Sequence, residues 1–347
     1  MNENLLIEGD NISGLIYLLE TKNLRGQIDL VYIDPPFATG SNFTITNGRA
    51  STISNSKNGT LAYTDKLKGD QFISFLKQRL VLLKELLSNQ GSIYLHIDYK
   101  IGHYVKVMMD EVFGTKSFRN DITRIKCNPK NFSQKGYGNI KDMILFYTKN
   151  DSFIWNEPHT EYTLEDQIRL YPKTDSDGRR YTTVPIHAPG ETNHGRSNQL
   201  FKGMNPPAGR HWRTDVETLN KWDDMGLLEW SSNGNPRKKN YMDEMKGKKV
   251  QDIWEYKDPP YPVYPTEKNI DMLHMIVNAS SNEDSIVLDC FCGSGSTLYA
   301  ATLNGRNWIG IDKSKEAINI TKKRFDEFQP TLFCPKPNYT FFELCIK

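Results

Sequence analysis

A carboxylate followed by two prolines and an aromatic ring is the first feature of this sequence that suggests chemistry. The segment LVYIDPPF, residues 30–37, is an apolar run that ends in Asp34 and continues into Pro35, Pro36 and Phe37. Two prolines hold the turn rigid and fix the direction of the Pro35 carbonyl. By itself, a strand-end aspartate such as Asp34 can be a helix cap, a ribose ligand or an acceptor for a substrate.

A second segment combines a strand-end aspartate with a glycine loop. In VLDCFCGSGST, residues 287–297, an apolar run ends at Asp289, Gly293 and Gly295 follow, and Ser296 opens a helical pattern. Glycines permit a tight strand-to-helix turn and let the backbone approach a ligand closely. Another apolar run ends at Asp312, where a carboxylate can accept hydrogen bonds from ribose hydroxyls. Together these features predict a site for an adenosine-containing cofactor. The loop matches neither the G-x-G-x-x-G dinucleotide motif nor a P-loop.

Five short apolar runs place these residues at the ends of strands. The expected strands are 4–10, 28–36, 91–98, 285–291 and 307–312. Continuous apolar runs of this length are typical of strands buried on both faces of a parallel sheet. Helical patterns lie between them, at 12–22, 70–88, 99–112, 267–280, 296–304 and 314–327. This alternation predicts a doubly wound α/β sheet, in which ligands bind at the carboxyl ends of the strands.

The alternation stops near residue 150 and resumes near 265. The intervening stretch is rich in Gly, Pro, Asn, Arg, Lys, Trp and Tyr and has little periodicity. We therefore expect an inserted domain between two halves of one sheet. The predicted divisions are 1–150, the insert 151–255, 256–328 and a C-terminal tail, 329–347, which is interpreted as a terminal strand or a partner contact.

Composition favours a soluble globular protein of the reducing cytoplasm. The chain has 347 residues and a formal net charge of +2, which alone does not indicate nucleic-acid binding. Its start has no basic and apolar regions of a secretory signal, and no stretch is apolar enough for a membrane span. No metal is expected, because the Cys and His residues lack zinc-ligand spacing. His96 and His103 are interpreted as structural. The cysteines are Cys127, Cys290, Cys292, Cys334 and Cys345.

The motifs DPPF at 34–37 and FCGSG at 291–295 together resemble those of amino-group DNA methyltransferases that use S-adenosylmethionine. The catalytic motif comes first and the cofactor motif last, an order that resembles the β class and implies a circularly permuted, Rossmann-like mixed sheet, mostly parallel, with an inserted target-recognition domain. The likeness to type III modification subunits and their shorter solitary relatives extends over most of the chain. Its further segments are 9–15, 91–114, 141–150, 209–213, 264–268 and 305–312.

The resemblance implies that Asp34 and the Pro35 carbonyl accept the two N–H groups of an exocyclic amine on a base rotated out of the duplex. Pro36 completes the rigid turn, and Phe37, where the family more often has Tyr, supplies a stacking face. Asp rather than Ser before Pro-Pro favours adenine N6 over cytosine N4.

The cofactor residues that the resemblance implies lie in four segments. Asp312 resembles the ribose ligand, Asp289 the residue near the methionine amino group, and Asp10 the residue near the adenine amine. Thr266 and Lys268 resemble a segment that closes over the methionine end, although the same residues also fit a helix start. The predicted cofactor-binding residues are Asp10, Thr266, Lys268, Asp289, Phe291, Cys292, Gly293, Ser294, Gly295, Ser296, Thr297 and Asp312.

The insert is expected to contact double-stranded DNA. It combines basic residues with aromatics, and Lys and Arg can meet phosphates while Arg can also read base edges. The predicted DNA-binding residues are Arg179, Arg180, Arg210, Trp212, Arg213, Arg237, Lys238 and Lys239. A homodimer and a companion restriction or specificity subunit are further candidate partners, in a cytoplasmic enzyme encoded by a bacterium or a phage.

The leading hypothesis is thus a sequence-specific DNA adenine-N6 methyltransferase. A cytosine-N4 enzyme of the same family is the first alternative. Methylation of RNA or of a protein glutamine is the second, although the related motif on those substrates usually begins with Asn. A non-catalytic DNA-binding subunit that keeps the fold is the third, and intact Asp34, Asp312 and glycine loop argue against it.

Overall fold

The computed structural model divides the chain into two compact units. Unit 1 comprises 1–158 and 251–347, and unit 2 comprises 159–250. The structure describes residues 4–36, 42–46, 49–52, 60–64, 70–129, 135–190, 197, 199–232, 234–258, 268–332 and 334–344. Between 37 and 69 only the backbone of three strands is described, β3 (Asn42–Thr46), β4 (Arg49–Thr52) and β5 (Thr60–Thr64), which form a separate small sheet.

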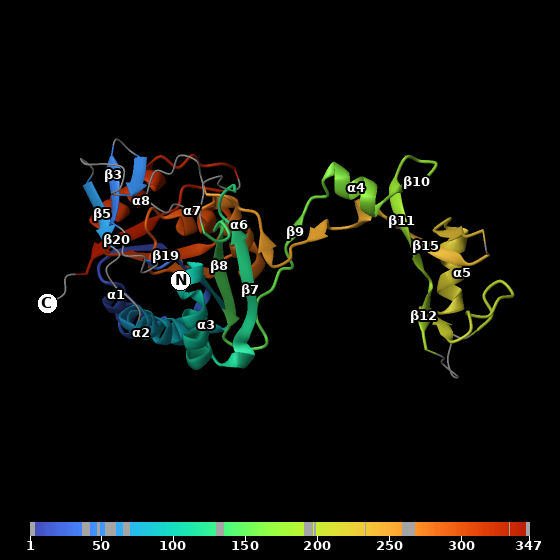
Figure 1. Cartoon of the computed structure of the whole chain (residues 1–347), viewed down its shortest axis with the longest axis horizontal. Helices are drawn as coiled ribbons and strands as arrows, with labels where there is room; N and C mark the ends of the chain where they lie inside the picture. Colours follow the sequence, from blue (N-terminus) through green and yellow to red (C-terminus); the bar gives the residue numbers. More distant parts are fainter. Residues whose placement is uncertain are drawn as a thin grey trace. The chain divides into compact units, whose positions relative to one another are not determined.

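A nine-stranded sheet in the order β17-β7-β8-β6-β2-β18-β19-β1-β20 forms the centre of unit 1 (Figure 1). Strand β8 runs antiparallel to both neighbours, and the other neighbouring pairs are parallel. This confirms the predicted mixed, mostly parallel α/β sheet. The strands are β1 (Asn4–Glu8), β2 (Ile28–Ile33), β6 (Leu87–Ile97), β7 (Phe118–Ile125), β8 (Lys141–Thr148), β17 (Ile253–Trp254), β18 (Ile286–Asp289), β19 (Asn307–Asp312) and β20 (Tyr339–Glu343).

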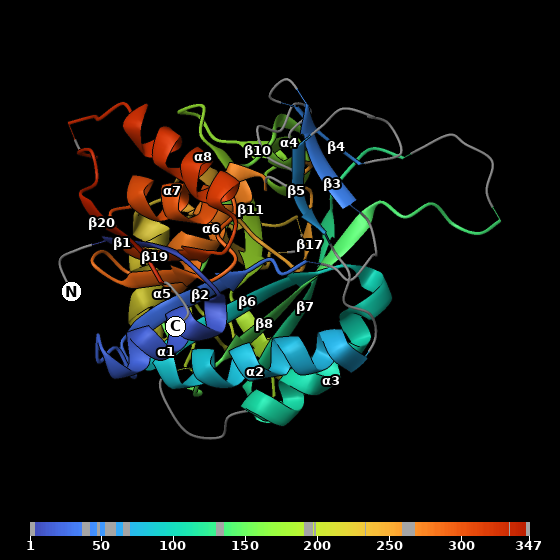
Figure 2. The ribbon, with the colours of Figure 1, turned by 90° about the vertical axis from the view of Figure 1, so that its left-hand side faces the viewer.

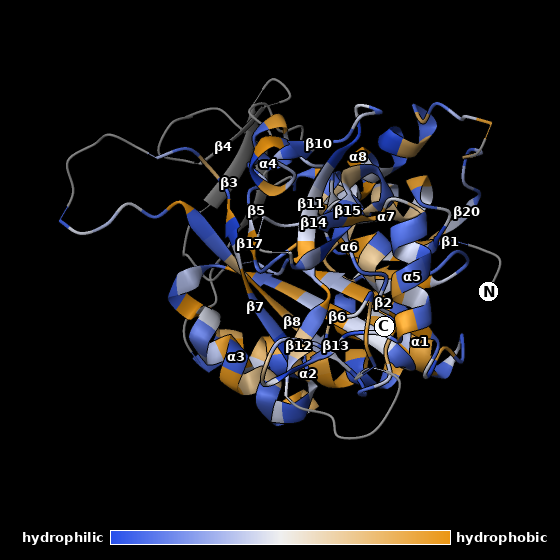
Figure 3. Ribbon diagram, turned by 90° about the vertical axis from the view of Figure 1, so that its right-hand side faces the viewer, coloured by the Kyte–Doolittle hydropathy of each residue, from blue (hydrophilic) through white to orange (hydrophobic). Residues whose placement is uncertain are grey.

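Helices cover both faces of this sheet (Figure 2). One face carries α1 (Asn11–Glu20), α2 (Asp70–Leu86) and α3 (Tyr99–Phe113), and the other carries α6 (Ile270–Ser280), α7 (Ser296–Leu303) and α8 (Lys315–Asp326). In Figure 3, α1, α2 and α3 show both hydrophilic and hydrophobic residues around their circumference, as expected for helices with one buried face.

The core fixes the carboxyl edge of the sheet, where the candidate site lies. Leu30, Val31 and Ile33 of β2 are fully buried, and β18 is buried along its whole length. Each fully buried side chain of this size contributes roughly 1.5–3 kcal/mol of transfer free energy, so the strands between the helix layers form a rigid frame. At their carboxyl ends follow four aspartates, Asp34 after β2, Asp98 after β6, Asp289 in β18 and Asp312 in β19.

Unit 2 is a small α/β unit with its own core. The strands are β9 (His159–Thr160), β10 (Lys173–Thr174), β11 (Arg180–Pro185), β12 (His187–Pro189), β13 (Arg210–Trp212), β14 (Leu228–Trp230), β15 (Pro236–Tyr241) and β16 (Lys248–Lys249), and the helices are α4 (Leu164–Leu170) and α5 (Val216–Asp224). Strands β10-β11-β15-β14 form one antiparallel sheet, while β12 pairs with β13 and β16 with β9. The core consists of Ile186, Phe201, Trp212, Leu219 and Leu228.

Two local expectations differ from the structure. The helix expected at 267–280 begins at Ile270, because the Asn269 side chain accepts hydrogen bonds from the Asp271 and Met272 amides and caps it. The insert expected at 151–255 is wider than unit 2, since Asn156 hydrogen-bonds to Ala279 and β17 pairs with β7. Strand β20 lies in the predicted tail and pairs with β1, which agrees with the interpretation of that tail as a terminal strand. Among the described residues, no helix is long and apolar enough to cross a membrane.

Candidate active site

At the carboxyl end of β2, one carboxylate oxygen of Asp34 forms an ion pair, and the other has no hydrogen-bond partner among the described residues. Its side chain is 14% exposed, and Oδ2 lies 2.9 Å from Nζ of Lys268, which precedes α6. Oδ1 is buried and has no hydrogen-bond partner in the described part of the chain. The nearest ionisable nitrogen on that side, Nδ1 of His96, is 3.9 Å away. A buried acceptor without a donor is costly, so this oxygen is suited to a ligand that brings an N–H group.

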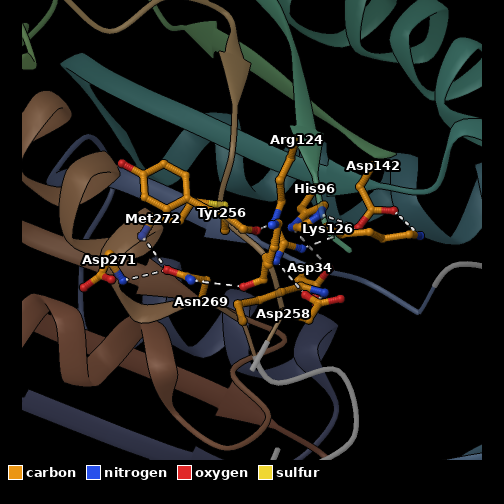
Figure 4. A network of polar contacts seen from close by, with 12 residues as sticks. Asp34, His96, Arg124, Lys126, Asp142, Tyr256, Asp258, Asn269, Asp271 and Met272 are labelled. Carbon is orange, nitrogen blue, oxygen red and sulfur yellow. Dashed lines mark hydrogen bonds and ion pairs between the residues drawn. The ribbon is translucent and has the colours of Figure 1, made fainter. Parts of the chain in front are cut away.

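His96 lies behind Asp34 in a buried polar network (Figure 4). Its Nε2 is 3.2 Å from Oδ2 of Asp142, and its Nδ1 is 2.9 Å from the Tyr32 hydroxyl. Burial, and then the charge of Lys268, lower the pKa of His96. Because ionised Asp142 can only accept, Nε2 carries the proton of the neutral ring, and Nδ1 accepts from Tyr32. His96 in this form offers no donor to Oδ1 of Asp34.

Asp142 joins His96 to two cations. Its carboxylate lies 2.6 Å from Nζ of Lys126 and 3.5 Å from Nη1 of Arg124. Burial alone would raise the pKa of Asp142, but hydrogen bonds from His96 and Lys126 and their charges hold it well below its usual range. Asp142 is therefore a structural anion of the network.

Arg124 connects this network to the chain that follows β17. Its side chain is fully buried, with Nη2 2.5 Å from Oδ1 of Asp258 and Nε donating to the Tyr256 carbonyl over 2.8 Å. The adjacent Lys257 carbonyl accepts from the Asn269 side chain over 3.0 Å. Strands β6, β7 and β8 thus meet residues 256–258 and residues 268–269 behind Asp34.

Asp289 and Asp312 are held mainly by the backbone of the glycine loop. Asp289 Oδ1 accepts from the Phe291 amide over 2.9 Å, and Asp289 also hydrogen-bonds to Thr297. Asp312 accepts from the Gly293 amide through Oδ2, over 2.9 Å, and from the Ser314 amide through Oδ1, over 2.8 Å. Burial raises the pKa of Asp289 to about 7, and the charges of Asp34 and Asp312 add to this effect. The pKa of Asp312 is also raised by burial.

The glycines of the loop are required by its geometry. Gly293 has φ +52° and Gly295 has φ +75°, values that other residues rarely adopt. A Cβ on Gly295 would lie 2.8 Å from Cγ2 of Thr321, whose hydroxyl donates to the Gly293 carbonyl. The loop is thus closely packed against α8 and its backbone is fixed from beneath.

The remaining predicted cofactor residues support the loop or lie elsewhere. Asp10 caps α1 through Oδ1 and lies 3.5 Å from Arg79 through Oδ2. Ser296 accepts from Arg324, and Phe291 packs near Phe75. Cys292, Ser294 and Thr297 are buried. The predicted residues Phe37 and Thr266 lie outside the described residues.

Several of the predicted DNA-binding residues are engaged within unit 2. Trp212 is 2% exposed, and its indole donates to the Gln199 carbonyl, so its assignment to DNA contact is corrected to a core role. Arg179 pairs with Asp243 and Glu244, and Lys239 pairs with Asp175. Lys238 lies over the Trp222 ring. The arginines without a carboxylate partner among described residues are Arg180, Arg210, Arg213 and Arg237.

The residues behind Asp34 were missed by sequence reasoning. His96, which the sequence suggests is structural, is a buried member of this network 3.9 Å from Asp34, while no sequence motif points to Tyr32, Arg124 or Asp142. The segment DITRIK around Arg124 has only two apolar residues, so the local sequence pattern gives no signal of the buried ion pair. None of the described His, Cys, Asp and Glu residues forms a group that could hold a metal ion.

Comparison with known proteins gives consistent relatives. The family model for DNA methylase (N6_N4_Mtase) matches residues 28–323. The Type II methyltransferase M.EcaI of Enterobacter cloacae is 42% identical over 329 residues, which are 93% of this chain and 69% of that protein. The DNA adenine methyltransferase YhdJ of Escherichia coli K12 is 26% identical, covering 89% and 80%. The type III EcoPI Mod subunit of Escherichia phage P1 is 26% identical, covering 93% and 59%.

Solved structures show the same fold at low sequence identity. TTHA0409 of Thermus thermophilus, described as a DNA modification methylase and crystallised with S-adenosyl-L-methionine, has a TM-score of 0.50 and 16% identity, and the match covers 98% of both chains. The cytosine-N4-specific PvuII DNA methyltransferase has a TM-score of 0.50 and 13% identity, covering 95% of this chain and 89% of that one.

Proposed function

Because this chain belongs to the DNA methylase family of N6 and N4 methyltransferases, we propose that it methylates the N6 amino group of adenine within a specific DNA sequence, with S-adenosylmethionine as donor. The family membership confirms the resemblance given by the DPPF and FCGSG motifs. One observation carries the assignment of the site: Asp34 has a buried oxygen, Oδ1, without a hydrogen-bond donor among the described residues, while Lys268 holds Oδ2.

Oδ1 of Asp34, which has no hydrogen-bond donor among the described residues, suits an exocyclic amine. The lone pair of such an amine is delocalised into the base, so the nitrogen is a poor nucleophile. Asp34 Oδ1 accepts one N–H group and the Pro35 carbonyl accepts the other, which draws the nitrogen toward tetrahedral geometry and directs its lone pair. In a buried site these charge-assisted bonds are stronger than in water. A base inside a duplex cannot reach this pocket, so it must first be rotated out of the stack.

The glycine loop, Asp289 and Asp312 fit an adenosine compound that carries a positive charge. Asp312 has remaining lone pairs for two ribose hydroxyls, and the backbone of Gly293 and Gly295 allows close approach. Asp289 is a buried carboxyl without a cation among the groups that act on it, so a ligand ammonium group would favour its charged form. When bound, S-adenosylmethionine supplies an electrophilic methyl group on a sulfonium.

The ion pair of Lys268 with Asp34 connects the proposed amine site with the proposed cofactor site. With S-adenosylmethionine bound, the cofactor would supply the methyl group, and Asp34 would accept the proton that the amine nitrogen loses through its hydrogen bond to Oδ1. Lys268 fixes the Asp34 carboxylate through Oδ2, so that Oδ1 keeps its direction during this change. We therefore assign Lys268 a positioning role toward Asp34, beside the predicted contact with the methionine end of the cofactor.

Adenine is favoured over cytosine by two observations. Asp rather than Ser precedes the two prolines, and the relative YhdJ is an adenine methyltransferase by name. The PvuII enzyme shares only the fold with this chain at 13% identity, so its cytosine specificity does not transfer.

Single-molecule sequencing of DNA from a methylation-free host that expresses the protein tests this proposal. We expect N6-methyladenine at one short recurring sequence. The Asp34→Ala variant should abolish the mark and keep cofactor affinity within about tenfold. Asp151→Ala is the matched control, because that carboxylate is 87% exposed and pairs only with Arg119 at the surface. N4-methylcytosine alone would overturn the adenine assignment, and a mark that persists in Asp34→Ala would overturn the site.

A further inference from the structure

Among the described basic residues of unit 2, one set is neutralised by carboxylates, and a separate cluster is not. In the neutralised set, Arg169 and Lys248 both lie 2.8 Å from Asp166, and Arg179 lies 2.7 Å from Asp243. Other members are Lys173 with Glu229, Lys202 with Asp223, Lys221 with Glu217 and Lys239 with Asp175. A carboxylate already satisfies each of these cations, so each would have to break a pair before it bound another anion.

The second set, here called the arginine–histidine cluster, comprises His187, Arg210, Arg213 and Arg237. Arg210 Nη1 lies 3.1 Å from His187 Nδ1, and Arg213 Nε donates to the His187 carbonyl over 3.2 Å. Arg237 donates to the Thr183 carbonyl and hydroxyl over 2.7 and 2.9 Å. Within the described residues, none of the three arginines forms an ion pair.

The positions of these residues in the strands explain why they gather. Strand β12 pairs with β13 so that Trp212 lies opposite His187 and Arg210 opposite Pro189, which places Arg210 and Arg213 within two residues of the position that faces His187. Arg237 lies opposite Pro185 in the pairing of β15 with β11, two residues before His187. Arg210 and Arg213 are exposed, whereas Arg237 and His187 are half-buried.

We propose that the arginine–histidine cluster binds backbone phosphates of DNA and that His187 takes up a proton when the phosphate binds. This inference rests on the proposed function and deepens it by naming the part of unit 2 that holds the DNA backbone. Guanidinium forks match the geometry of phosphate oxygens, and the hydrogen bonds within the cluster leave most of their five N–H donors available. Three neighbouring cations with no ion-pair partner among the described residues repel one another, and a phosphate removes that repulsion.

His187 is a neutral base in the free cluster. A guanidinium can only donate, so its bond to Nδ1 requires an unprotonated nitrogen there. Burial, followed by the charges of Arg210, Arg213 and Arg237, lowers the pKa of His187. Glu229, which lies opposite Arg237 in the β14–β15 pairing, is engaged by Lys173 and Tyr181 instead.

A bound phosphate supplies the negative charge that the cluster lacks. It favours the imidazolium form of His187, and protonation of Nδ1 releases Arg210 to the phosphate as well. The nearby His211 has its Nδ1 at the Gly190 carbonyl, so it is the other titratable group to control. DNA affinity is therefore expected to rise as pH falls through the His187 transition.

The test measures fluorescence anisotropy of a labelled duplex that carries the methylation site mapped by sequencing. Salt titrations compare the wild type with Arg210→Gln and Arg213→Gln, and Arg169→Gln is the matched control from the neutralised set. Each cluster variant should lower the slope of log affinity against log salt by about 0.9, the value of one lost phosphate contact, while the control keeps the wild-type slope. Equal slopes for cluster and control variants would overturn the site.

A pH series from about 8 to about 6 tests the proton uptake. As pH falls between the His187 pKa of the complex and that of the free protein, wild-type affinity should rise by up to about tenfold per pH unit, and His187→Asn should remove this rise, whereas His211→Asn should keep it. A rise that persists in His187→Asn would overturn the role of His187. Cofactor binding by calorimetry stays at the wild-type value in all these variants. A wild type that leaves DNA unmethylated in the sequencing assay contradicts the proposed function itself, independently of the cluster.

Discussion

Two buried carboxylates at the same edge of the sheet are treated in opposite ways by their surroundings. Asp142 and Asp289 are 3% and 2% exposed. Asp142 is surrounded by His96, Arg124 and Lys126, and its pKa lies well below the usual range. Asp289 faces backbone amides and other carboxylates, and its pKa is raised to about 7. Burial is equal, so the neighbouring charges decide the difference.

Asp142 belongs to a structural site whose charges are balanced by the chain itself, whereas Asp289 belongs to a site that a ligand would complete. The charge of Asp142 is balanced by residues of the chain, and the network around it holds its shape without a ligand. Asp289 lacks a cation among the described residues, and a positively charged cofactor would supply one. Asp34 lies between them, near His96 on one side and close enough to Asp289 to raise its pKa. Perturbed carboxyl groups of this second type mark functional sites.

The largest effect should come from removal of the Asp142 charge. Asp142→Asn leaves Arg124, His96 and Lys126 without their buried anion, and we expect a loss of about 3–5 kcal/mol in the free energy of unfolding. Urea denaturation at neutral pH measures this loss. Asp289→Asn is the matched substitution at an equally buried site, and it should cost far less because its carboxyl is already half protonated there. Equal losses in the two variants would contradict the comparison.

Substitution of Lys268 tests how the direction of the Asp34 carboxylate is fixed. Lys268→Met removes the ion pair at Oδ2, and kcat should fall by about thirtyfold, or roughly 2 kcal/mol, because the carboxylate loses its fixed direction. Calorimetry should show cofactor affinity changed by less than about threefold, and Lys268→Arg should restore most of kcat. A large loss of cofactor affinity with unchanged kcat would instead assign Lys268 to the methionine end alone.

Asp289 should couple both stability and cofactor binding to pH. Its carboxyl keeps a proton in the folded protein that the unfolded chain has already released, so its contribution to stability falls as pH rises from about 4 to about 7. Cofactor affinity should rise over the same range, by up to about tenfold per pH unit, because an ammonium group needs the charged form. The difference between wild type and Asp289→Asn isolates both effects. Parallel pH curves for the two proteins would refute this coupling.

Asp10 should give the smallest effect. Its carboxylate caps α1 through the Ile12 and Ser13 amides, so Asp10→Ala should lower the free energy of unfolding by about 1 kcal/mol. The predicted contact with the cofactor adenine adds a second readout. If cofactor affinity in calorimetry equals that of the wild type, Asp10 serves only as a helix cap, and the cofactor contact is excluded.

The sequence predicted the parts of the site that depend on local pattern. Asp34, Asp289 and Asp312 follow apolar runs, and strands of a parallel sheet bring such ends to one edge, as the pairing of β2, β18 and β19 shows. The glycine loop was equally predictable from the sequence, because its conformation is determined within a few residues. These features need only the periodicity of the chain and the rule that ligands bind at carboxyl strand ends.

The network behind Asp34 was not predictable in this way. His96 meets Asp142, and Arg124 meets Asp258, over separations of 46 and 134 residues. No local pattern encodes which buried charges pair when strands β7 and β8 fold back beside β6. For the same reason Trp212 was assigned to DNA, since an aromatic between basic residues fits an exposed surface and the core of unit 2 equally well. Strand β8 was also missed as a strand, although it is buried along seven of its eight residues.

The two-stranded sheet of β9 and β16, here called the ribbon, affects how the inserted unit can be exchanged during evolution. The chain enters unit 2 at His159 and leaves it after Val250, and His159 is paired with Lys249 across the ribbon. An insert whose ends are joined in this way can be exchanged for another without lengthening or twisting the strands that lead to the chemistry. On the role in DNA contact proposed above for unit 2, such an exchange would alter DNA binding in a single event and leave Asp34 and the glycine loop unchanged. Grafts between relatives should be cut at the two strands of the ribbon.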